Sequence, residues 1–319
     1  MPIIAFFDRY RKWNNKRTTL LQRMHIYGIY NAIWDFVANI ILGLWFIFSR
    51  HNYSLKQSCD RSCENLVISF TSFPLRISRV WMTVESLLRQ TIMPSAIVLY
   101  LSRSQFPGEF ADLPKSLLRL RNRGLDIRFV DDDIRSHKKY FYAFRDFPEC
   151  SIITVDDDAL YPENLIETLW NLHCKYPAAV IGNRAKRIFP TIPRYEHWPA
   201  VNYQEYNPDL IFIGCAGILY PPNSLHKDAF DIDAIKRLAF STDDIWLSCM
   251  ARINGTPMLS TGYDYHHLQT LIPGNVTLIG HNAQGSNQHT VEKLNAYYLD
   301  KIGKRPFVDM VGCYNANKS

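Results

Sequence analysis

The sequence predicts an α/β fold, with a mostly parallel sheet flanked by helices and a membrane-associated helical segment at the N-terminus. Segments typical of strands and helices alternate from residue 65 onward, and such alternation indicates βαβ units. The 319 residues, of which 47% are hydrophobic and 21% charged, suffice to bury one large core or two modest ones. A basic stretch followed by a long apolar run occupies the first 50 residues.

Residues 1–25 are a basic tail, in which six arginines and lysines stand against Asp8 alone. Because the whole chain carries a net charge of +6, the remainder is close to neutral. A basic tail on a nearly neutral body favours an anionic membrane surface and disfavours nucleic acid as a partner. The sequence does not indicate an oligomeric state.

Residues 26–50 predict a membrane-associated helix. The run 29–48 has Asp35 as its only charged residue and is about long enough to span a bilayer. On a helix, Asn31, Asp35 and Asn39 form one narrow polar stripe, so an interfacial helix and a spanning helix both stay open, as does a buried core helix. We expect the interfacial form at the cytoplasmic face; the alternative is a single-pass anchor with a lumenal catalytic domain.

We expect a linker over residues 51–64 and one α/β domain over residues 65–319. Strands are predicted at 65–73, 95–102, 125–130 and 151–155, and helices at 76–90, 113–124, 137–147 and 162–176. Later in the chain, a strand-like run at 211–222 is interrupted by small residues, and an apolar helix is predicted at 241–253.

Two aspartate triplets follow predicted strands, Asp131–Asp133 and Asp156–Asp158. Ligands of parallel sheets bind at the carboxyl ends of the strands, so we expect both triplets to line one cleft. Four residues after the first triplet are expected to neutralise it, namely Arg135, His137, Lys138 and Lys139. The second triplet has no basic residue before Lys175 and therefore needs a cation from elsewhere.

Carboxylate oxygens suit Mg²⁺ or Mn²⁺. In an extended segment Asp156 and Asp158 point to the same side, so that one can bind the metal while the other reaches a ribose hydroxyl or a water. The alternative is that the triplet is only a solvated loop ahead of the helix that Pro162 opens.

The order of "SFTSFPLRI", "VESLLRQT", "IVLYLS", "FVDDD" and "IITVDDDALYP" resembles GT-A glycosyltransferases, close to the family 2-like enzymes that build bacterial surface polysaccharides. The resemblance covers roughly residues 65–260. It implies a GT-A sheet with a nucleotide-sugar half at 65–160 and an acceptor half at 161–319. It also implies metal-dependent transfer from a nucleotide sugar, a UDP-sugar by preference, to a lipid-linked or oligosaccharide acceptor.

The same resemblance implies the site residues. The DxD element is matched by Asp156, Asp157 and Asp158, with Mn²⁺ or Mg²⁺ held by Asp158 and Asp156 and, from the C-terminal segment, by His281 and His289. The implied donor contacts are Thr71, Ser72, Arg76, Asp131, Asp132, Lys139, Asp156 and Asp157. For Thr71, Ser72, Arg76 and the turn Asp131–Asp133, the alternative is plain turn chemistry with an exposed arginine. For His281 and His289, the alternative is a surface or core histidine whose hydrogen bonds are satisfied without a metal.

The segment "STDDIWLSCMARI" at 241–253 resembles the Glu-Asp element of the family, in which the aspartate is the base of inverting members. Asp243 takes the place of the glutamate, and Asp244 takes the position of the base. The alternative is a helix cap, because carboxylates are favoured at helix N-termini. The helix start would lower the pKa of Asp244, whereas the donor diphosphate would raise it.

Acceptor contacts are expected at Gly214, Ala216 and Gly217, because small residues in a strand let a ligand approach the backbone; a plain bulge is the alternative. The polar segment 282–290 is expected to be a loop that closes over the donor. Two other functions use the same residues: a metal-dependent nucleotidyltransferase, and a catalytically inactive GT-A-like binding protein. Against the former, no Gly-rich phosphate loop with a lysine lies near the first strand.

Overall fold

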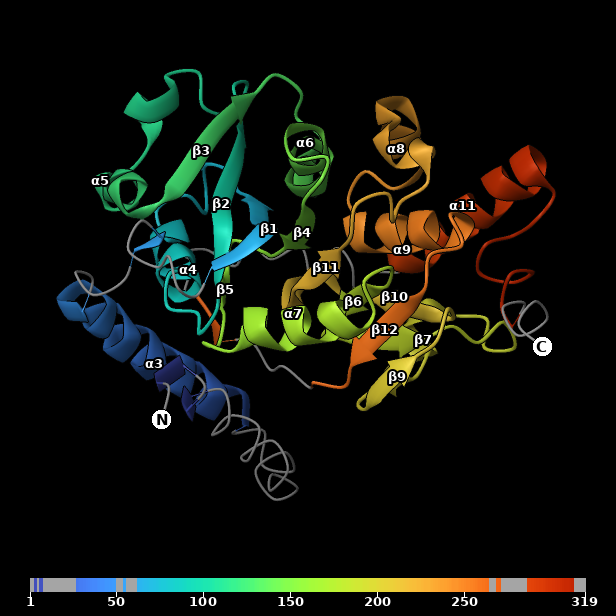
Figure 1. Ribbon diagram of the computed structural model, residues 1–319, viewed down its shortest axis with the longest axis horizontal. Coiled ribbons are helices and arrows are strands. Elements are labelled where there is room, and N and C mark those ends of the chain that lie inside the picture. Colours follow the sequence, from blue (N-terminus) through green and yellow to red (C-terminus); the bar gives the residue numbers. More distant parts are fainter. Residues whose placement is uncertain are drawn as a thin grey trace.

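The computed structural model describes residues 3–4, 6–7, 27–49, 54–55, 62–263, 268–270 and 286–312. At its centre is an eight-stranded sheet with helices packed on it (Figure 1). In spatial order its strands are β3 (Leu125–Val130), β2 (Met93–Ser102), β1 (Ser62–Thr71), β4 (Ser151–Thr154), β11 (Ile218–Tyr220), β6 (Val180–Gly182), β12 (Met258–Thr261) and β9 (Gln204–Tyr206). The first four run parallel, as do β6 and β12, whereas β11 and β9 are antiparallel to their neighbours. The predicted mostly parallel α/β sheet is confirmed.

The helices cover both faces of this sheet. They are α4 (Val80–Leu87), α5 (Lys115–Leu118), α6 (Lys138–Asp146), α7 (Leu165–Lys175), α8 (Ile232–Leu238), α9 (Asp243–Ile253) and α11 (Asn287–Ile302). Side chains alternate along the strands, so Ile68 and Ile153 pack with α4 and α7 on one face, and Val67 and Ile152 pack with α6 on the other. A separate core packs α8, α9 and α11 against strands β6, β11 and β12.

Several predicted boundaries shift for local reasons. β1 begins at Ser62, inside the predicted linker. The predicted helix 113–124 is a single α-turn followed by a 3-10 helix, and it ends as predicted at Gly124, which has φ 113°. The run 211–222 divides into two strands of different sheets, because the backbone turns between them at Gly217 with φ 84°.

Two smaller sheets complete the fold. One contains β10 (Leu210–Phe212), β7 (Ala185–Arg187) and β8 (Ala200–Val201), and the other pairs β5 (Ala159–Leu160) with β13 (Leu268–Gln269). The N-terminal helix α3 (Tyr27–Ser49) lies against α4 and β13 (Figure 1). Helix α11 begins at Asn287, so the end of the predicted loop 282–290 is helical; residues 282–285 lie outside the described residues.

The order of the strands places a topological switch point between β1 and β4. From β1 the chain moves outward to β2 and β3 and then returns to pair β4 with the other side of β1. Loops that leave the carboxyl ends of β1 and β4 therefore diverge, and such a point is where open α/β sheets bind ligands. The second aspartate triplet follows β4 at this place.

Candidate active site

The second triplet is held by side chains from the loop that follows β1. Asp157 is buried and accepts hydrogen bonds from Ser72 Oγ (2.5 Å) and from Arg76 Nη1 (2.9 Å). The same Arg76 nitrogen lies 2.9 Å from Asp158 Oδ2. The triplet needs a cation from elsewhere, as predicted, and Arg76 is one such cation.

This placement gives the residues after β1 a role that the sequence did not predict. Ser72 and Arg76 position the triplet, and Thr71 Oγ1 donates a hydrogen bond to the carbonyl of Tyr100 (2.7 Å). Asp157, which was also predicted to contact the donor, points into the protein. A direct contact between any of these side chains and a nucleotide stays a prediction.

Lys139 joins the triplet to the start of α9. Its Nζ lies 2.7 Å from Asp156 Oδ1 and 2.9 Å from Asp243 Oδ2, and its side chain is buried. Burial disfavours the ammonium, but the two carboxylates outweigh it and raise the pKa of Lys139 well above its ordinary value. Lys139 is therefore an internal cation that links two carboxylates that are distant in the sequence, Asp156 and Asp243.

The two carboxylates at the start of α9 differ in their pKa. Burial is the largest influence on Asp243 and opposes its ionisation, but the electrostatic influence of Lys139 and His137, together with hydrogen bonds from Ser136 and Lys139, outweighs burial and lowers the pKa of Asp243. Asp244 is half-buried, and its Oδ1 accepts a hydrogen bond from the backbone N–H of Ile245 (2.9 Å). Burial, followed by repulsion from Asp243, raises the pKa of Asp244 to about 7. The lowering expected from the helix start is therefore outweighed.

The glycine-bearing turn between β10 and β11 lies beside both acidic groups. A Cβ at Gly214 would lie 3.6 Å from Lys139 Nζ and 3.7 Å from Asp244 Cβ. Gly217 has φ 84°, and a Cβ there would lie 3.1 Å from Leu165 Cδ1, so both its conformation and its surroundings favour glycine. The acceptor contacts predicted for this turn stay predictions, but the turn lies at the site.

Two polar residues that the sequence analysis did not single out hold this turn. Tyr161 Oη accepts a hydrogen bond from Asp156 N (2.8 Å) and donates one to the carbonyl of Cys215 (3.0 Å). Asn183 Nδ2 donates to the carbonyl of Ala216 (2.9 Å), and the side chains of both residues are fully buried. Nothing in the sequence distinguishes this tyrosine or this asparagine from ordinary core and turn residues.

The first triplet has different surroundings. Its pairs are Asp131 with Arg103 (2.8 Å), Asp132 with Tyr142 (3.3 Å) and Asp133 with Lys138 (2.5 Å). The side chain of Asp131 is 89% exposed. The triplet follows β3, and β2 and β1 lie between β3 and β4 in the sheet. Both triplets therefore lie at the carboxyl ends of parallel strands, but in the described residues they do not contact each other.

The cations predicted to neutralise the first triplet act differently from expectation. Lys138 does pair with it, but Lys139, the next residue on the helix, pairs with the second triplet. Burial lowers the pKa of His137 to about 4, so this histidine is neutral. The Arg135 guanidinium lies 4.4 Å from the centre of the Phe240 ring, and only its backbone N–H contacts the triplet.

The balance of charge around the turn fits a divalent cation. The second triplet and the start of α9 together supply five carboxylates: Asp156, Asp157, Asp158, Asp243 and Asp244. In the described part of the chain two cations, Arg76 and Lys139, make ion pairs with these carboxylates. Burial, followed by repulsion from the other two aspartates of the triplet, raises the pKa of Asp158 to about 7. An additional positive charge here would let all five ionise.

The set of donor atoms is also suitable. Asp156 and Asp158 are only partly buried, and the ion pairs above engage one oxygen of each. Two aspartates can hold a divalent ion whose other ligands are phosphate oxygens and waters. Among the described residues no group of three or more His, Cys, Asp or Glu side chains is placed so that it could hold a metal ion. His289 is exposed at the start of α11, and His281 lies outside the described residues.

The sequence matches no family model and no curated protein. Among solved structures, the chain is similar to TarS 1–349 from S. aureus, with 13% identity over 64% of this chain and 58% of that one, and a TM-score of 0.41. The mannosyltransferase PcManGT from Pyrobaculum calidifontis, in complex with GDP-Man and Mn²⁺, has 13% identity over 88% of this chain and 78% of that one, with a TM-score of 0.45. An apo UDP-glucose pyrophosphorylase has 10% identity over 76% of this chain and 99% of that one, with a TM-score of 0.39. At this level of likeness none of the three assigns an activity to this chain.

Proposed function

We propose that the chain is a metal-dependent, inverting glycosyltransferase that moves a sugar from a nucleotide-sugar donor, a UDP-sugar by preference, to a lipid-linked or oligosaccharide acceptor in surface glycan synthesis. One observation carries the proposal: a DxD-type triplet at the switch point and a carboxylate with a raised pKa meet at one glycine-bearing turn. The first group suits a metal and a diphosphate, and the second suits proton abstraction.

Asp156 and Asp158 are the proposed ligands of Mn²⁺ or Mg²⁺. When bound, the ion would stabilise the negative charge that develops on the departing nucleoside diphosphate. Ser72 and Arg76 hold the middle aspartate, Asp157, inside the protein, which keeps the two flanking carboxylates on one side of the loop. The nucleotide contacts proposed beyond the triplet are Thr71, Asp131 and Asp132.

Asp244 is the proposed base. As the acceptor oxygen attacks C1 of the sugar, the bond from C1 to the diphosphate oxygen breaks and the acceptor hydroxyl proton passes to Asp244. A base is most effective when its pKa lies near the working pH, and the pKa of about 7 meets that condition. Asp243 stays ionised beside Lys139 and positions the helix start. Gly214, which has no side chain next to this carboxylate, is the proposed place where the acceptor approaches it.

A screen of nucleotide sugars tests the proposal. Purified protein with Mn²⁺ is expected to release nucleoside diphosphate from one donor class, and a chelator is expected to stop the release. Nucleoside triphosphates together with sugar 1-phosphates form the second arm. Release of pyrophosphate in that arm, with no reaction in the first, would identify a nucleotidyltransferase, and a silent protein that still binds Mn²⁺ would identify a binding protein.

We also propose that the protein works at the cytoplasmic face of a membrane. The window Ala32–Ser49 is the part of the described chain that is long and apolar enough to cross a bilayer, with a mean hydropathy of 1.8, and the basic tail precedes it. A buried core helix or a signal sequence passes the same test of length and composition. Protease added to the cytoplasmic side of sealed vesicles should digest the domain beyond residue 65, and protection would indicate a lumenal domain.

A further inference from the structure

Helix α3 has the polarity of its faces reversed relative to a helix of a water-soluble protein. Its exposed side chains include Ile33, Phe36, Val37, Ile40, Ile41, Leu44, Ile47 and Phe48. These positions recur every three or four residues and form one continuous outer stripe. Asn39, by contrast, is buried against the domain. The predicted polar stripe therefore faces inward where it is described, and the outer surface is apolar.

The inner face of α3 packs on the domain, and the surface that it contacts is called its seat. Ala38, Leu42 and Phe46 are fully buried and pack with Met82 of α4 and Leu160 of β5. Leu160 lies two residues after the last aspartate of the second triplet. The helix is thus packed against the domain from Ala38 to Phe46, next to the segment that carries the proposed metal ligands.

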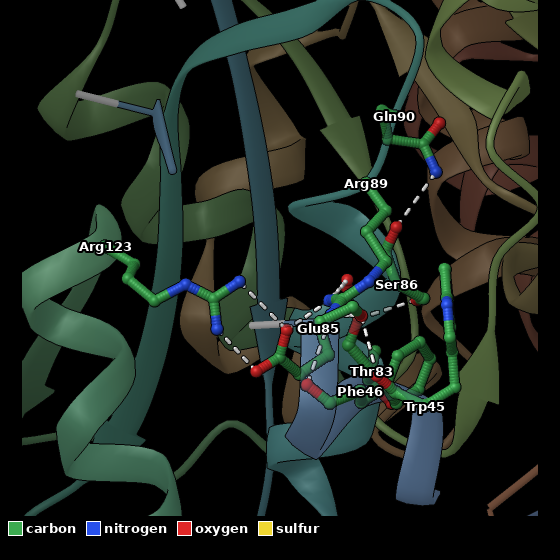
Figure 2. Close-up of polar contacts among 9 residues, drawn as sticks. Trp45, Phe46, Thr83, Glu85, Ser86, Arg89, Gln90 and Arg123 are labelled. Atoms are coloured by element: carbon green, nitrogen blue, oxygen red, sulfur yellow. Dashed lines mark hydrogen bonds and ion pairs between the residues drawn. The ribbon is translucent and has the colours of Figure 1, made fainter. Parts of the chain in front are cut away.

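A buried ionic cluster fixes the C-terminal end of α3 (Figure 2). Arg89 pairs with Glu85 and donates through Nη2 to the carbonyl of Phe46 (3.3 Å) and to Ser49 Oγ (2.9 Å). Its guanidinium carbon lies 4.6 Å from the centre of the Phe46 ring. Arg123 pairs with the same Glu85 (2.5 Å). An arginine that donates to the last carbonyls of a helix complements its dipole, so α3 is bound at a specific place.

Helix α4 and the residues just after it also form hydrogen bonds with the loop 157–162, which begins inside the second triplet. Thr83 Oγ1 donates to the carbonyl of Asp157 (2.9 Å), and Ser86 Oγ accepts from the backbone N–H of Tyr161 (3.1 Å). Gln90 Nε2 donates to the carbonyl of Pro162 (2.8 Å). Figure 2 shows Thr83, Ser86 and Gln90 near the arginine that holds α3. One short helix therefore connects the seat of α3 to the backbone of residues 157–162.

We propose that α3 lies flat in one leaflet of an anionic membrane, and that its seat on α4 transmits lipid binding to the aspartate loop and strengthens metal binding there. The occupant of the outer stripe is a phospholipid leaflet, because the stripe is apolar and the adjoining tail is basic. A spanning orientation would carry the adjoining polar domain surface into hydrocarbon. The coupling rests on the proposed metal site, whereas the docking does not.

The docking is tested by flotation of the intact protein with vesicles. Wild type is expected to float with phosphatidylcholine vesicles that contain phosphatidylglycerol, and to stay bound in high salt because the apolar contact is not screened. Leu44→Ser combined with Ile47→Ser changes only exposed positions and should weaken flotation in high salt, where the attraction of the basic tail is screened, with unchanged circular dichroism. In high salt, flotation of this double variant equal to that of wild type, or no flotation of wild type, would overturn the lipid-docking face.

The coupling is tested by amide hydrogen exchange at residues 157–162 together with Mn²⁺ titration. Leu42→Ala loosens the seat without touching the ionic cluster, and Leu294→Ala removes an equally buried leucine from the core around α11 as a matched control. Leu42→Ala should speed exchange in the loop and weaken Mn²⁺ binding by roughly fivefold or more, within the range of allosteric couplings. Leu294→Ala should do neither.

Vesicles should slow exchange in the loop of wild type and tighten its Mn²⁺ binding. Unchanged exchange in Leu42→Ala would show that α3 is only a tether and would overturn the coupling. If exchange responds as expected but wild type binds no Mn²⁺, the coupling of α3 to the loop stands while its effect on metal binding and the proposed metal site both fail. The two failures are therefore distinguishable.

Discussion

The two aspartate triplets have the same sequence and opposite surroundings. The first follows β3 near the edge of the sheet and pairs with side chains around it, and Asp131 projects into solvent. The second follows β4 beside the switch point, where its middle residue is buried and its partners come from the loop after β1 and from α6. The comparison shows that position in the sheet, and not the acidic pattern, decides which triplet carries excess negative charge.

Adjacent residues of α6 make the same contrast at closer range. Lys138 pairs with Asp133 of the first triplet and Lys139 with Asp156 of the second, and both lysines are buried. Only Lys139 also pairs with a carboxylate of the other half of the domain, Asp243. The second triplet is therefore part of a network that assembles only when the two halves fold together.

The largest expected effect is the loss of metal binding in Asp158→Ala. This change removes one of the two proposed ligands at the site with excess negative charge, so Mn²⁺-dependent donor binding and turnover should both be abolished. Isothermal titration with Mn²⁺, in the presence and absence of donor, measures the loss. Equal metal affinity in Asp158→Ala and wild type would refute the assignment of the metal site.

The second prediction concerns the base at the other side of the turn. Asp244→Asn should leave donor and metal binding nearly intact and lower kcat by at least about 10²-fold, because it removes proton abstraction and little ground-state binding. Steady-state kinetics with donor and acceptor measure the effect. Near-normal transfer would mean that Asp244 only accepts the hydrogen bond of the helix start.

The third prediction uses the neighbouring lysines as a matched pair. Lys139→Met leaves Asp156 and Asp243 without their shared buried cation, and breaking such a pair costs roughly 3–5 kcal/mol. Lys138→Met leaves a single carboxylate, Asp133, which keeps its hydrogen bonds from Gln105 and from the backbone N–H of Arg135, so it should cost less. Urea unfolding of both variants gives the two free energies of unfolding, and equal values would contradict the difference between the triplets.

The sequence predicted the architecture because strand and helix patterns follow from local periodicity. β3 at 125–130 has its predicted bounds, and α9 begins at the predicted acidic residues. The placement of both triplets at strand ends was also predictable. The partners were not, because the contact of Lys139 with Asp243 and that of Tyr161 with Cys215 depend on which distant strands become neighbours.

The inward polar face of α3 shows the same limit. The stripe of Asn31, Asp35 and Asn39 was visible in the sequence, but a polar stripe on an apolar helix is ordinarily expected to face water. The structure buries Asn39, whose Nδ2 donates to the carbonyl of Asp35 (2.8 Å). Only the contacts of α3 with α4 reveal which face belongs to the protein.

A smaller effect is expected from pH. The carboxyl of Asp244 is close to Asp243, Lys139 and Asp156, and burial first and Asp243 second raise its pKa to about 7. Below that pH the base is protonated in the free enzyme, so kcat/KM should fall by roughly tenfold per unit of pH, and it should level off above it. The profile is measured from initial rates at low donor concentration, because kcat/KM reports the pKa values of the free enzyme. In Asp244→Asn the residual activity should lack this inflection.

The smallest effect is expected from Asp131→Ala in the first triplet. Its carboxylate is almost fully exposed and pairs with the exposed Arg103, and ion pairs of this kind contribute roughly 0–1 kcal/mol. The variant should therefore keep the stability and the Mn²⁺ affinity of wild type. If the first triplet contacts the nucleotide as proposed, the KM for the donor should rise while kcat changes little, because the lost contact is made equally in the ground and transition states. Donor titration against initial rate measures both constants. A loss of Mn²⁺ affinity as large as that of Asp158→Ala would mean that the two triplets act as one site, and the distinction between an exposed, locally paired triplet and a buried, networked one would not hold.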